Sequence, residues 1–373
     1  MKAIILIGGE GRRLQPLSAR TPKQLVPILN HPLLEYLLLH LRGHGVEHVT
    51  LATTPAPGAE AIRTMFGNGA ALGLDIEYAY EESPLGSGGA IASVAAGWDE
   101  PFLVANGDIV TDVDITAMIE NHHANRAELS VFVKAVDDPS RFGVTVLGAN
   151  DKIVHFVEKP QGGAPSNLVN GGAWIFQPSL LEEMDATQHN MVERELFPHL
   201  AAADRGIFGF QNDCYWIDVG TPESYLKTNL DLLLGAAPTL LPDDWPVDGP
   251  NAGVSAAGAA LSADASIDAP ALIGAGSKVH NGARLAGPIS LGVNCIVQTN
   301  ASVGGSVLWD GVTIDEGATV RDSILASGVT VGAGATIDGA VIAQGATVAE
   351  GATVPAGTAI DVDTRYSLIA ATP

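Results

Sequence analysis

The second half of the chain places an apolar residue at every sixth position, and this regularity restricts its possible folds more than any other feature. Three six-residue strands complete one turn of a triangular coil, and the small residues between the apolar positions let the chain turn at each corner. A flexible tail rich in Gly and Ala would not keep this register through so many repeats. The sequence therefore predicts a hexapeptide-repeat parallel β-helix. The apolar positions are Leu261, Ile267, Ile273, Val279, Leu285, Leu291, Val297 and Val303.

The register of the repeat slips after Val303. Similar blocks then begin at Ile314, Val331 and Val348, each 17 residues after the last, and they read IDEGATV, VGAGATI and VAEGATV. A step of 17 is one triangular turn of three hexapeptides less one residue, so we expect the coil to continue through this region.

The first part of the chain has a different pattern, in which short apolar runs alternate with helical periodicity. We expect strands over residues 3–7, 46–52, 76–80 and 102–105. Strands separated by helices predict a Rossmann-like, mostly parallel sheet, and ligands bind such sheets at the carboxyl ends of the strands. The expected organisation is an α/β domain over 1–235, a linker over 236–255, the β-helix over 256–363 and a tail over 364–373.

The formal net charge of −23 argues against nucleic acid and anionic membrane as partners, because both require a basic surface. Only two cysteines are present, without disulfide or zinc spacing, so we expect a cytoplasmic location. The apolar N-terminus ends in glycines and is interpreted as a buried strand, because it lacks the basic region and cleavage site of a signal peptide.

A glycine-rich run follows the first predicted strand, where backbone N–H groups can approach phosphate closely. Residues 8–18 read GGEGRRLQPLS and residues 22–25 read PKQL. These residues resemble the signature of the sugar nucleotidyltransferase family, GGxGxRLxPLT followed by PK. Arg12 departs from the family, which often has Thr there, and we interpret it as a solvated charge.

Further segments of the first domain resemble the same family. They are PLGSGG at 84–89, NGD at 106–108, FGV at 142–144, VEKP at 157–160, NGG at 170–172 and WIDVGTP at 216–222. The resemblance is strongest to mannose-1-phosphate guanylyltransferases with a C-terminal left-handed β-helix. It implies an enzyme that joins a sugar 1-phosphate to a nucleoside triphosphate and releases pyrophosphate, with mannose 1-phosphate and GTP as the expected substrates.

The resemblance also implies the roles of individual residues. Arg13, Lys23 and Asp108 are the expected catalytic residues, and Asp108 and Asp218 are expected to hold Mg²⁺, which prefers oxygen ligands and substrate phosphates. The expected nucleotide-binding residues are Gly8, Gly9, Gly11, Arg13, Glu82, Pro84, Gly86 and Ser87. The expected sugar-phosphate-binding residues are Gly143, Glu158, Lys159 and Asn170.

The choice of nucleobase follows from the segment before Pro84. Thymidylyl- and uridylyltransferases of the family typically place a Gln there, whereas this chain has Glu81, Glu82 and Ser83. A carboxylate only accepts hydrogen bonds, which suits the N–H donors of guanine. The alternatives are a glucose-1-phosphate thymidylyl- or uridylyltransferase, a heptose-1-phosphate guanylyltransferase, and a bifunctional enzyme whose β-helix transfers acyl groups.

Other polar residues have simpler interpretations. Asp112 and Asp114 are expected to cap the following helix. His122 and His123 are expected to be solvated, and His280 to be structural. We expect the β-helix to serve assembly or regulation, because its flat faces and end coils can self-associate into a homo-oligomer.

Overall fold

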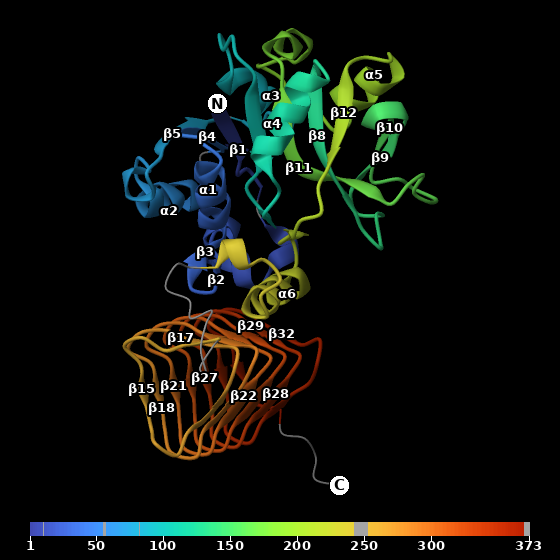
Figure 1. Ribbon diagram of the computed structural model, residues 1–373. Helices are drawn as coiled ribbons and strands as arrows, with labels where there is room; N and C mark the ends of the chain where they lie inside the picture. The colour runs from blue at the N-terminus through green and yellow to red at the C-terminus, as the bar shows by residue number, and fades with distance from the viewer. Residues whose placement is uncertain (10, 55–56, 82, 242–252, 369–373) are drawn as a thin grey trace. The chain divides into compact units, whose positions relative to one another are not determined.

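The computed structural model describes residues 1–9, 11–54, 57–81, 83–241 and 253–368 (Figure 1). The chain forms two compact units. The first contains Met1–Gly9 and Leu37–Trp216, and the second contains Glu10–Tyr36 and Ile217–Pro373. The glycine-rich signature is therefore divided: its first two glycines belong to the first unit, and its remainder shares the second unit with the β-helix.

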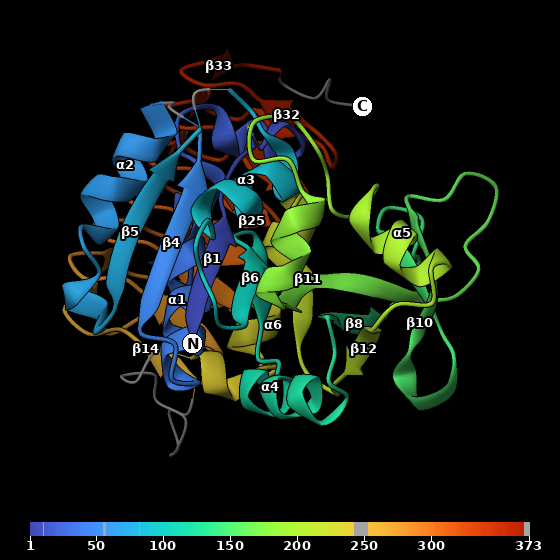
Figure 2. The same cartoon turned by 90° about the horizontal axis from the view of Figure 1, so that it is seen from above.

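The core of the first unit is a parallel sheet. Its strands are β1 (Lys2–Leu6), β4 (His48–Thr53), β5 (Asp75–Tyr80) and β6 (Phe102–Asn106), in the order β6-β1-β4-β5 (Figure 2). Ala3, Ile4 and Ile5 of β1 are fully buried, as expected for a strand covered on both faces. The predicted Rossmann-like sheet is confirmed.

Antiparallel strands extend this sheet beyond β6. β11 (Leu168–Phe176) runs antiparallel to β6 and pairs with β9 (Gly143–Leu147) and β8 (Leu129–Ala135). β10 (Ile153–Glu158) pairs with β9, and β12 (Ile207–Gln211) runs parallel to β8. Trp174, Phe176 and Phe197 form the centre of the apolar core between this half of the sheet and its helices.

The helices of the chain are α1 (Leu33–Gly43), α2 (Pro57–Phe66), α3 (Gly86–Val94), α4 (Ile115–Ala124), α5 (Leu196–Ala202) and α6 (Pro222–Leu233). Local sequence explains where two of them begin. Asp114 accepts a hydrogen bond from the Ala117 N–H over 2.9 Å and is the N-cap of α4, as predicted. Thr221 and Ser224 form a capping box at α6, with Pro222 as the first helical residue.

Two expectations about polar residues near α4 are wrong. Asp112 caps no helix and instead accepts a hydrogen bond from the Tyr215 N–H over 2.6 Å. His122 is not solvated but fully buried, with ring nitrogens 2.9 Å from Ser130 Oγ and 3.1 Å from Gln177 Nε2. The two hydrogen-bond partners compensate its burial, and they come from segments that the sequence pattern does not connect to α4.

The β-helix of the second unit consists of three parallel sheets. The first contains β14 (Val254–Ser255), β17 (Ala271–Ile273), β20 (Ile289–Leu291), β23 (Val307–Leu308), β26 (Ile324–Leu325), β29 (Val341–Ile342) and β32 (Ala359–Ile360). The second contains β15 (Ala260–Leu261), β18 (Lys278–Val279), β21 (Ile296–Val297), β24 (Thr313–Ile314), β27 (Thr330–Val331), β30 (Thr347–Val348) and β33 (Arg365–Tyr366). The third contains β16 (Ser266–Asp268), β19 (Arg284–Ala286), β22 (Ser302–Gly304), β25 (Thr319–Arg321), β28 (Thr336–Asp338) and β31 (Thr353–Val354).

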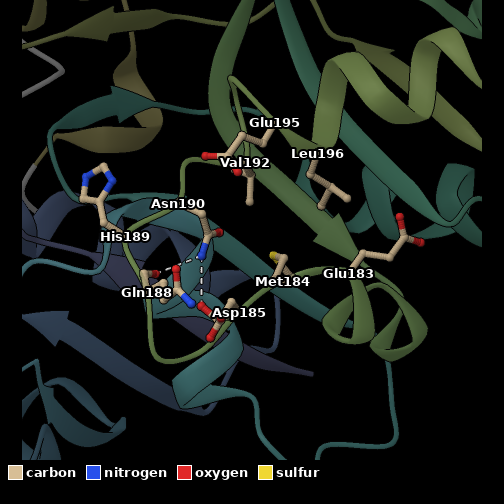
Figure 3. A pocket seen from close by; sticks show the side chains of 9 residues that line it. All are labelled: Glu183, Met184, Asp185, Gln188, His189, Asn190, Val192, Glu195 and Leu196. Atoms are coloured by element: carbon tan, nitrogen blue, oxygen red, sulfur yellow. Dashed lines mark hydrogen bonds between the residues drawn. The ribbon is translucent and has the colours of Figure 1, made fainter.

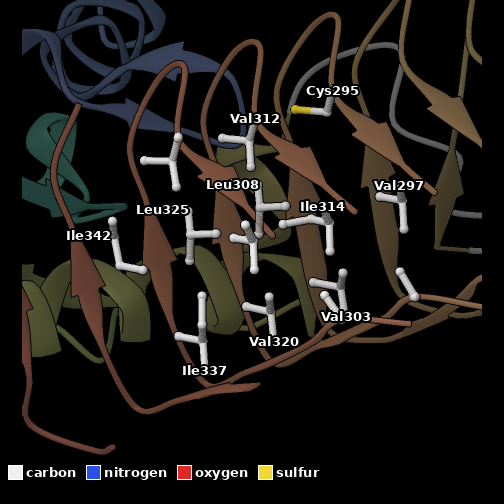
Figure 4. Close-up of a cluster of buried hydrophobic side chains, with 14 of the residues drawn as sticks. Cys295, Val297, Val303, Leu308, Val312, Ile314, Val320, Leu325, Ile337 and Ile342 are labelled. Carbon is white, nitrogen blue, oxygen red and sulfur yellow. The ribbon is translucent and has the colours of Figure 1, made fainter. Parts of the chain in front are cut away.

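The register of these sheets confirms the predicted coil. Leu261 pairs with Val279, which is three hexapeptides later in the chain. Ile314 pairs with Val331, so the later coil is one residue shorter, as expected. From Ile273 onward the apolar anchors point inward and stack in a continuous buried core (Figure 4), whereas Leu261 in the first coil is 42% exposed.

The second unit also contains the segment that carries most of the signature. This segment begins with three short 3₁₀ helices, η1 (Arg12–Leu14), η2 (Leu17–Ala19) and η3 (Lys23–Leu25). It continues into a hairpin of β2 (Pro27–Ile28) and β3 (His31–Pro32). We call residues 11–32 the signature segment. Two further short strands in the chain are β7 (Ile109–Thr111) and β13 (Trp216–Asp218).

Candidate functional site

The turns after β1 and β6 leave the sheet at the same edge. Leu6 pairs with Asn106 in the parallel register, and the Gly107 N–H donates to the Leu6 carbonyl over 2.9 Å. A Cβ on Gly107 would lie 2.6 Å from Ile7 Cγ2, so the close approach requires glycine. The turn places Asp108, a predicted metal ligand, half-buried at the carboxyl edge where Gly8 and Gly9 begin the signature.

Asn170 reaches this edge from β11. A Cβ on Gly172, two residues later, would lie 3.0 Å from Asn106 Nδ2. Asn170 Oδ1 accepts hydrogen bonds from the Gly172 N–H over 3.0 Å and from Trp174 Nε1 over 2.7 Å. Because both donors occupy the amide oxygen, the Nδ2 group is the part of Asn170 that can donate to a ligand.

Glu158 and Lys159 lie at the end of β10, beside Gly143. The Lys159 ammonium is 2.9 Å from Glu158 Oε1, and a Cβ on Gly143 would lie 2.9 Å from Glu158 Oε2. The Glu158 side chain is only 11% exposed, whereas that of Lys159 is 53% exposed. Lys159 has a positive φ of 47° and donates its N–H to the Phe142 carbonyl over 3.0 Å, so the backbone turns outward here.

Two predicted sugar-binding motifs, FGV and NGG, meet around Trp216, the first residue of the WIDVGTP motif. Its indole N–H donates to the Gly171 carbonyl over 2.8 Å, and its ring contacts that of Phe142 edge-to-face with centroids 5.5 Å apart. The FGV and NGG motifs therefore converge on Trp216 within the first unit, although they are separated along the chain.

Residues 83–89, a loop that continues into the first turn of α3, are held by the segment over 185–195. Glu81 Oε2 accepts a hydrogen bond from the Leu85 N–H over 2.8 Å, so this carboxylate supports the loop itself. Gly86 has a φ of 70°, and a Cβ there would lie 2.3 Å from the Asn190 carbonyl. Gly88 donates its N–H to the same carbonyl over 3.0 Å.

The Ser87 side chain is part of this attachment. Its hydroxyl donates to Glu193 Oε2 over 2.5 Å and accepts from the Val192 N–H over 3.1 Å. A nucleotide at this loop would therefore meet the backbone N–H of Ser87 more readily than its hydroxyl. Pro84, three residues before Ser87, is exposed.

Glu193 is a residue of this site that the sequence analysis missed. Burial raises the pKa of its carboxyl; the negative charge of Glu158 raises it further, and the hydrogen bond from Ser87 and the charge of Lys159 lower it. These effects place Glu193 between the loop over 83–89 and the pair of Glu158 and Lys159. Glu193 stands in a segment without a recognised motif, and nothing in the sequence distinguishes it from the nearby Glu195.

Arg13, Lys23 and Asp218 come together in the second unit. Asp218 lies 3.8 Å from Arg13 Nη2 through one oxygen and 3.8 Å from Lys23 Nζ through the other. A Cβ on Gly220 would lie 3.0 Å from both Arg13 Nη2 and Asp218 Oδ1, so both side chains pack closely against the backbone of this residue. Gly11, with a φ of 59°, lies against Lys23, because a Cβ there would be 3.2 Å from Lys23 Cβ.

The three residues differ in exposure. The Lys23 side chain is 9% exposed, that of Asp218 is 23% and that of Arg13 is 60%. A buried lysine needs an anionic partner, and Asp218 supplies it. Most of the Arg13 side chain remains accessible to a ligand.

The predicted site residues are thus assembled in two groups. The first unit holds Gly8, Gly9, Pro84, Gly86, Ser87, Asp108, Gly143, Glu158, Lys159 and Asn170, and the second holds Gly11, Arg13, Lys23 and Asp218. Glu82 lies outside the described residues.

Behind the loop over 83–89 there is a small pocket of about 200 Å³ (Figure 3). Its lining includes Asp185, whose carboxylate accepts from Thr187, and Asn190, whose amide group donates to the carbonyls of Asp185 and Gln188. These side chains serve the segment that supports the loop. Among the described residues, no cluster of three or more Asp, Glu, His or Cys side chains could hold a metal by itself.

Two family models match the chain. The nucleotidyl transferase model matches residues 2–234, and the model of the EIF2B subunit epsilon LbH domain matches residues 254–360. The first covers more than half of the chain, so this chain belongs to the nucleotidyl transferase family. The second match agrees with the stacked parallel sheets, and the predicted left-handed β-helix is confirmed.

Three individual proteins show how similar this chain is to particular members of the family. Mannose-1-phosphate guanylyltransferase from Mycobacterium tuberculosis is 34% identical over 84% of this chain and 81% of its own. A UTP–glucose-1-phosphate uridylyltransferase from Synechocystis is 29% identical over 83% of each chain. The crystal structure of HddC from Yersinia pseudotuberculosis complexed with GMP-PN has a TM-score of 0.53 and 27% identity, covering 62% of this chain and 99% of that one. No described helix is long and apolar enough to cross a membrane.

Proposed function

We propose that this enzyme makes GDP-mannose and pyrophosphate from GTP and mannose 1-phosphate. The observation that carries the proposal is the likeness to the mycobacterial mannose-1-phosphate guanylyltransferase, which extends through both the nucleotidyltransferase region and the β-helix. The predicted ligand residues of the first unit gather at the carboxyl edge of its sheet, and this grouping supports the proposal because parallel sheets bind their ligands at that edge.

The reaction needs charge neutralisation and positioning more than covalent chemistry. A phosphate oxygen of the sugar 1-phosphate attacks the α-phosphorus of the triphosphate, and the bond from that phosphorus to the bridging oxygen of pyrophosphate breaks. Arg13 and Lys23 would neutralise the triphosphate, with Asp218 orienting both cations. Lys159 would hold the sugar phosphate, and Glu158 and Asn170 would bind sugar hydroxyls.

Nucleotidyltransferases of this family generally use a divalent metal, and we propose that the metal of this enzyme is Mg²⁺. Asp108 and Asp218 offer only carboxylate oxygens, which fits the preference of Mg²⁺ for one or two carboxylates together with substrate phosphates. No larger acidic cluster is needed for such a site. Bound there, the ion would offset the negative charge of the phosphates.

Preference for guanine rests on the absence of a Gln before Pro84 and on the identity of the relatives. Glu81 supports the loop through Leu85, so a carboxylate that reads the base would have to be Glu82. Because one relative is a UTP–glucose-1-phosphate uridylyltransferase, glucose 1-phosphate with UTP is the second candidate pair of substrates. A matrix of GTP, ATP, UTP and dTTP against mannose, glucose and heptose 1-phosphates decides between them. A higher kcat/KM for UTP or dTTP than for GTP would contradict the guanine assignment.

The β-helix is proposed to serve assembly, regulation or support. Its coils follow one another in steps of 17 or 18 residues, as in the pairs of Val279 with Val297 and Val331 with Val348. Such steps leave no room for an inserted loop that could bind an acyl donor, and this supports a role other than acyl transfer. An acyl-transfer assay on the full chain tests the bifunctional alternative.

A cytoplasmic homo-oligomer without nucleic acid or membrane partners remains our expectation, and light scattering tests its subunit count.

A further inference from the structure

The signature segment and the β-helix contact each other directly within the second unit. Asn30, in the turn between β2 and β3, donates its side-chain N–H to the Leu291 carbonyl of β20 over 2.9 Å. Helix α6 also lies against β20. The hairpin that follows Lys23 is therefore attached to the first sheet of the β-helix.

Tyr225 of α6 is at the centre of this attachment. Its side chain is fully buried, and its hydroxyl donates to the Pro27 carbonyl. The same oxygen accepts a hydrogen bond from Trp309 Nε1 over 2.8 Å, and the two rings meet at 66° with centroids 6.2 Å apart. One hydroxyl thus connects a side chain of the β-helix to the backbone of the signature segment.

A second residue of α6 strengthens the same attachment. Asn229 is fully buried, and its Oδ1 accepts from the Leu29 N–H over 3.0 Å. Its Nδ2 donates to the Tyr225 carbonyl over 3.0 Å. The backbone of the hairpin is therefore fixed at both Pro27 and Leu29.

These fixed points lie close to Lys23 along the chain. The Val26 N–H donates to the Lys23 carbonyl over 3.3 Å, and the Val26 carbonyl accepts from the Leu33 N–H over 3.0 Å. Lys23 is thus held in a turn whose end is anchored at Pro27.

Trp309 is well placed to act as a rigid support. It is 3% exposed, and its backbone N–H donates to the Leu325 carbonyl of the next coil over 2.8 Å. Its own carbonyl accepts from the Cys295 thiol of the preceding coil at 3.1 Å. Its main chain is therefore bonded to both neighbouring coils.

We propose that Trp309 and Tyr225 are positioning residues, through which the β-helix holds Lys23 and the signature segment in the geometry that binds the triphosphate. The proposal rests on the proposed function, because it assigns the triphosphate to Lys23 and Arg13. A displacement of about 1 Å at a group that binds the reacting atoms can cost roughly 100-fold in rate, even when its cause lies far from the chemistry. The β-helix therefore contributes to catalysis without contributing a residue that touches substrate.

The test uses the full chain with the variants Trp309→Phe and Tyr225→Phe. Trp309→Phe keeps a ring and removes the N–H donor, and Tyr225→Phe removes both hydrogen bonds of the hydroxyl. Ile337→Ala is the control, because Ile337 is buried in the β-helix core and has no part in the attachment. It creates a cavity and reports the effect of lost β-helix stability alone.

We expect kcat/KM for the triphosphate to fall about threefold to tenfold in Trp309→Phe, the range for loss of one hydrogen bond. Tyr225→Phe should show a larger fall. The KM for sugar 1-phosphate should change less than the KM for triphosphate in both. Ile337→Ala should lower the melting temperature and leave both KM values near those of the wild type. Unchanged triphosphate kinetics in Tyr225→Phe, or an equal loss in Ile337→Ala, would overturn the proposal.

Hydrogen–deuterium exchange of the signature segment gives a second readout that does not depend on activity. Exchange at residues 23–33 should be faster in Trp309→Phe and Tyr225→Phe than in the wild type, and unchanged in Ile337→Ala. If the wild type releases no pyrophosphate with any substrate, the proposed function fails while this measurement still tests the attachment. Wild-type exchange rates in Tyr225→Phe would overturn the attachment itself.

Discussion

The ammonium group of Lys23 lies 3.8 Å from a carboxylate oxygen of Asp218, and the opposite oxygen of Asp218 lies 3.8 Å from Arg13. The two cations belong to the first motif of the chain and the carboxylate to its last. Three charges that the sequence suggests separately thus form one group, in which Asp218 offsets a positive charge that would otherwise be costly to bury.

Asp218→Asn should lower kcat by about 10² to 10³, because it removes the charge that orients both cations and one proposed metal ligand. Steady-state pyrophosphate release with saturating substrates measures the effect. The matched control is Asp231→Asn, which removes a carboxylate paired with Lys227 on α6 and should be nearly neutral. If both variants kept the wild-type kcat, Asp218 would have no catalytic role.

Asp108→Asn should cause a comparable loss, and EDTA should abolish turnover in the wild type until Mg²⁺ is restored. Asp114→Asn serves as the control, since Asn also caps helices well and Asp114, which caps α4 and lies 3.9 Å from His44, is not among the predicted site residues. Full activity in EDTA would contradict a metal requirement, and a near-wild-type Asp108→Asn enzyme would remove Asp108 from the site.

Glu193→Gln should weaken the loss of enzyme stability that occurs as pH rises above the ordinary pKa range of a Glu carboxyl. Because burial raises the pKa of Glu193, the folded state keeps its proton at pH values where the unfolded state has lost it. Stability is therefore lost as pH rises through this raised pKa, and Gln avoids that loss. The melting temperature of the variant should exceed that of the wild type at about pH 8, with a smaller difference at about pH 5. Glu195→Gln, in the same segment but exposed, should show no such trend.

Acidification should destabilise the enzyme through His122. Burial lowers its pKa from 6.5 to about 4, with a smaller contribution from His123. The folded state then binds fewer protons than the unfolded state between these values, so stability falls as pH drops from 6.5 toward 4, by up to roughly 3 kcal/mol. Urea unfolding across this range should show a weaker pH dependence in His122→Asn. The exposed neighbour provides the control, and His123→Asn should retain the wild-type slope.

Most of the fold could be predicted because its patterns are local. The β-helix follows from one apolar residue per strand, and a register such as Ile314 with Val331 can be obtained by counting. The parallel strands near the N-terminus follow from short buried runs. The antiparallel position of β11 beside β6 could not be predicted, because strand order depends on long-range packing that no local pattern records.

The motifs of the candidate site could be predicted from the sequence, whereas the residues that contact and support those motifs could not. Lys23 and Asp218 stand in recognisable motifs, whereas Glu193 and Trp309 stand in none. Their roles arise from tertiary contacts, with Ser87 in one case and Tyr225 in the other. The burial of His122 was missed for the same reason, since its partners lie on other elements.

The most direct test of the central claim is to incubate the enzyme with GTP and mannose 1-phosphate and to quantify both products together. Mass spectrometry and a pyrophosphate assay should show GDP-mannose and pyrophosphate in equal amounts, with neither formed when one substrate is omitted. Release of phosphate or pyrophosphate from GTP without the sugar phosphate, or absence of any sugar nucleotide across the substrate matrix, would contradict a sugar-1-phosphate nucleotidyltransferase.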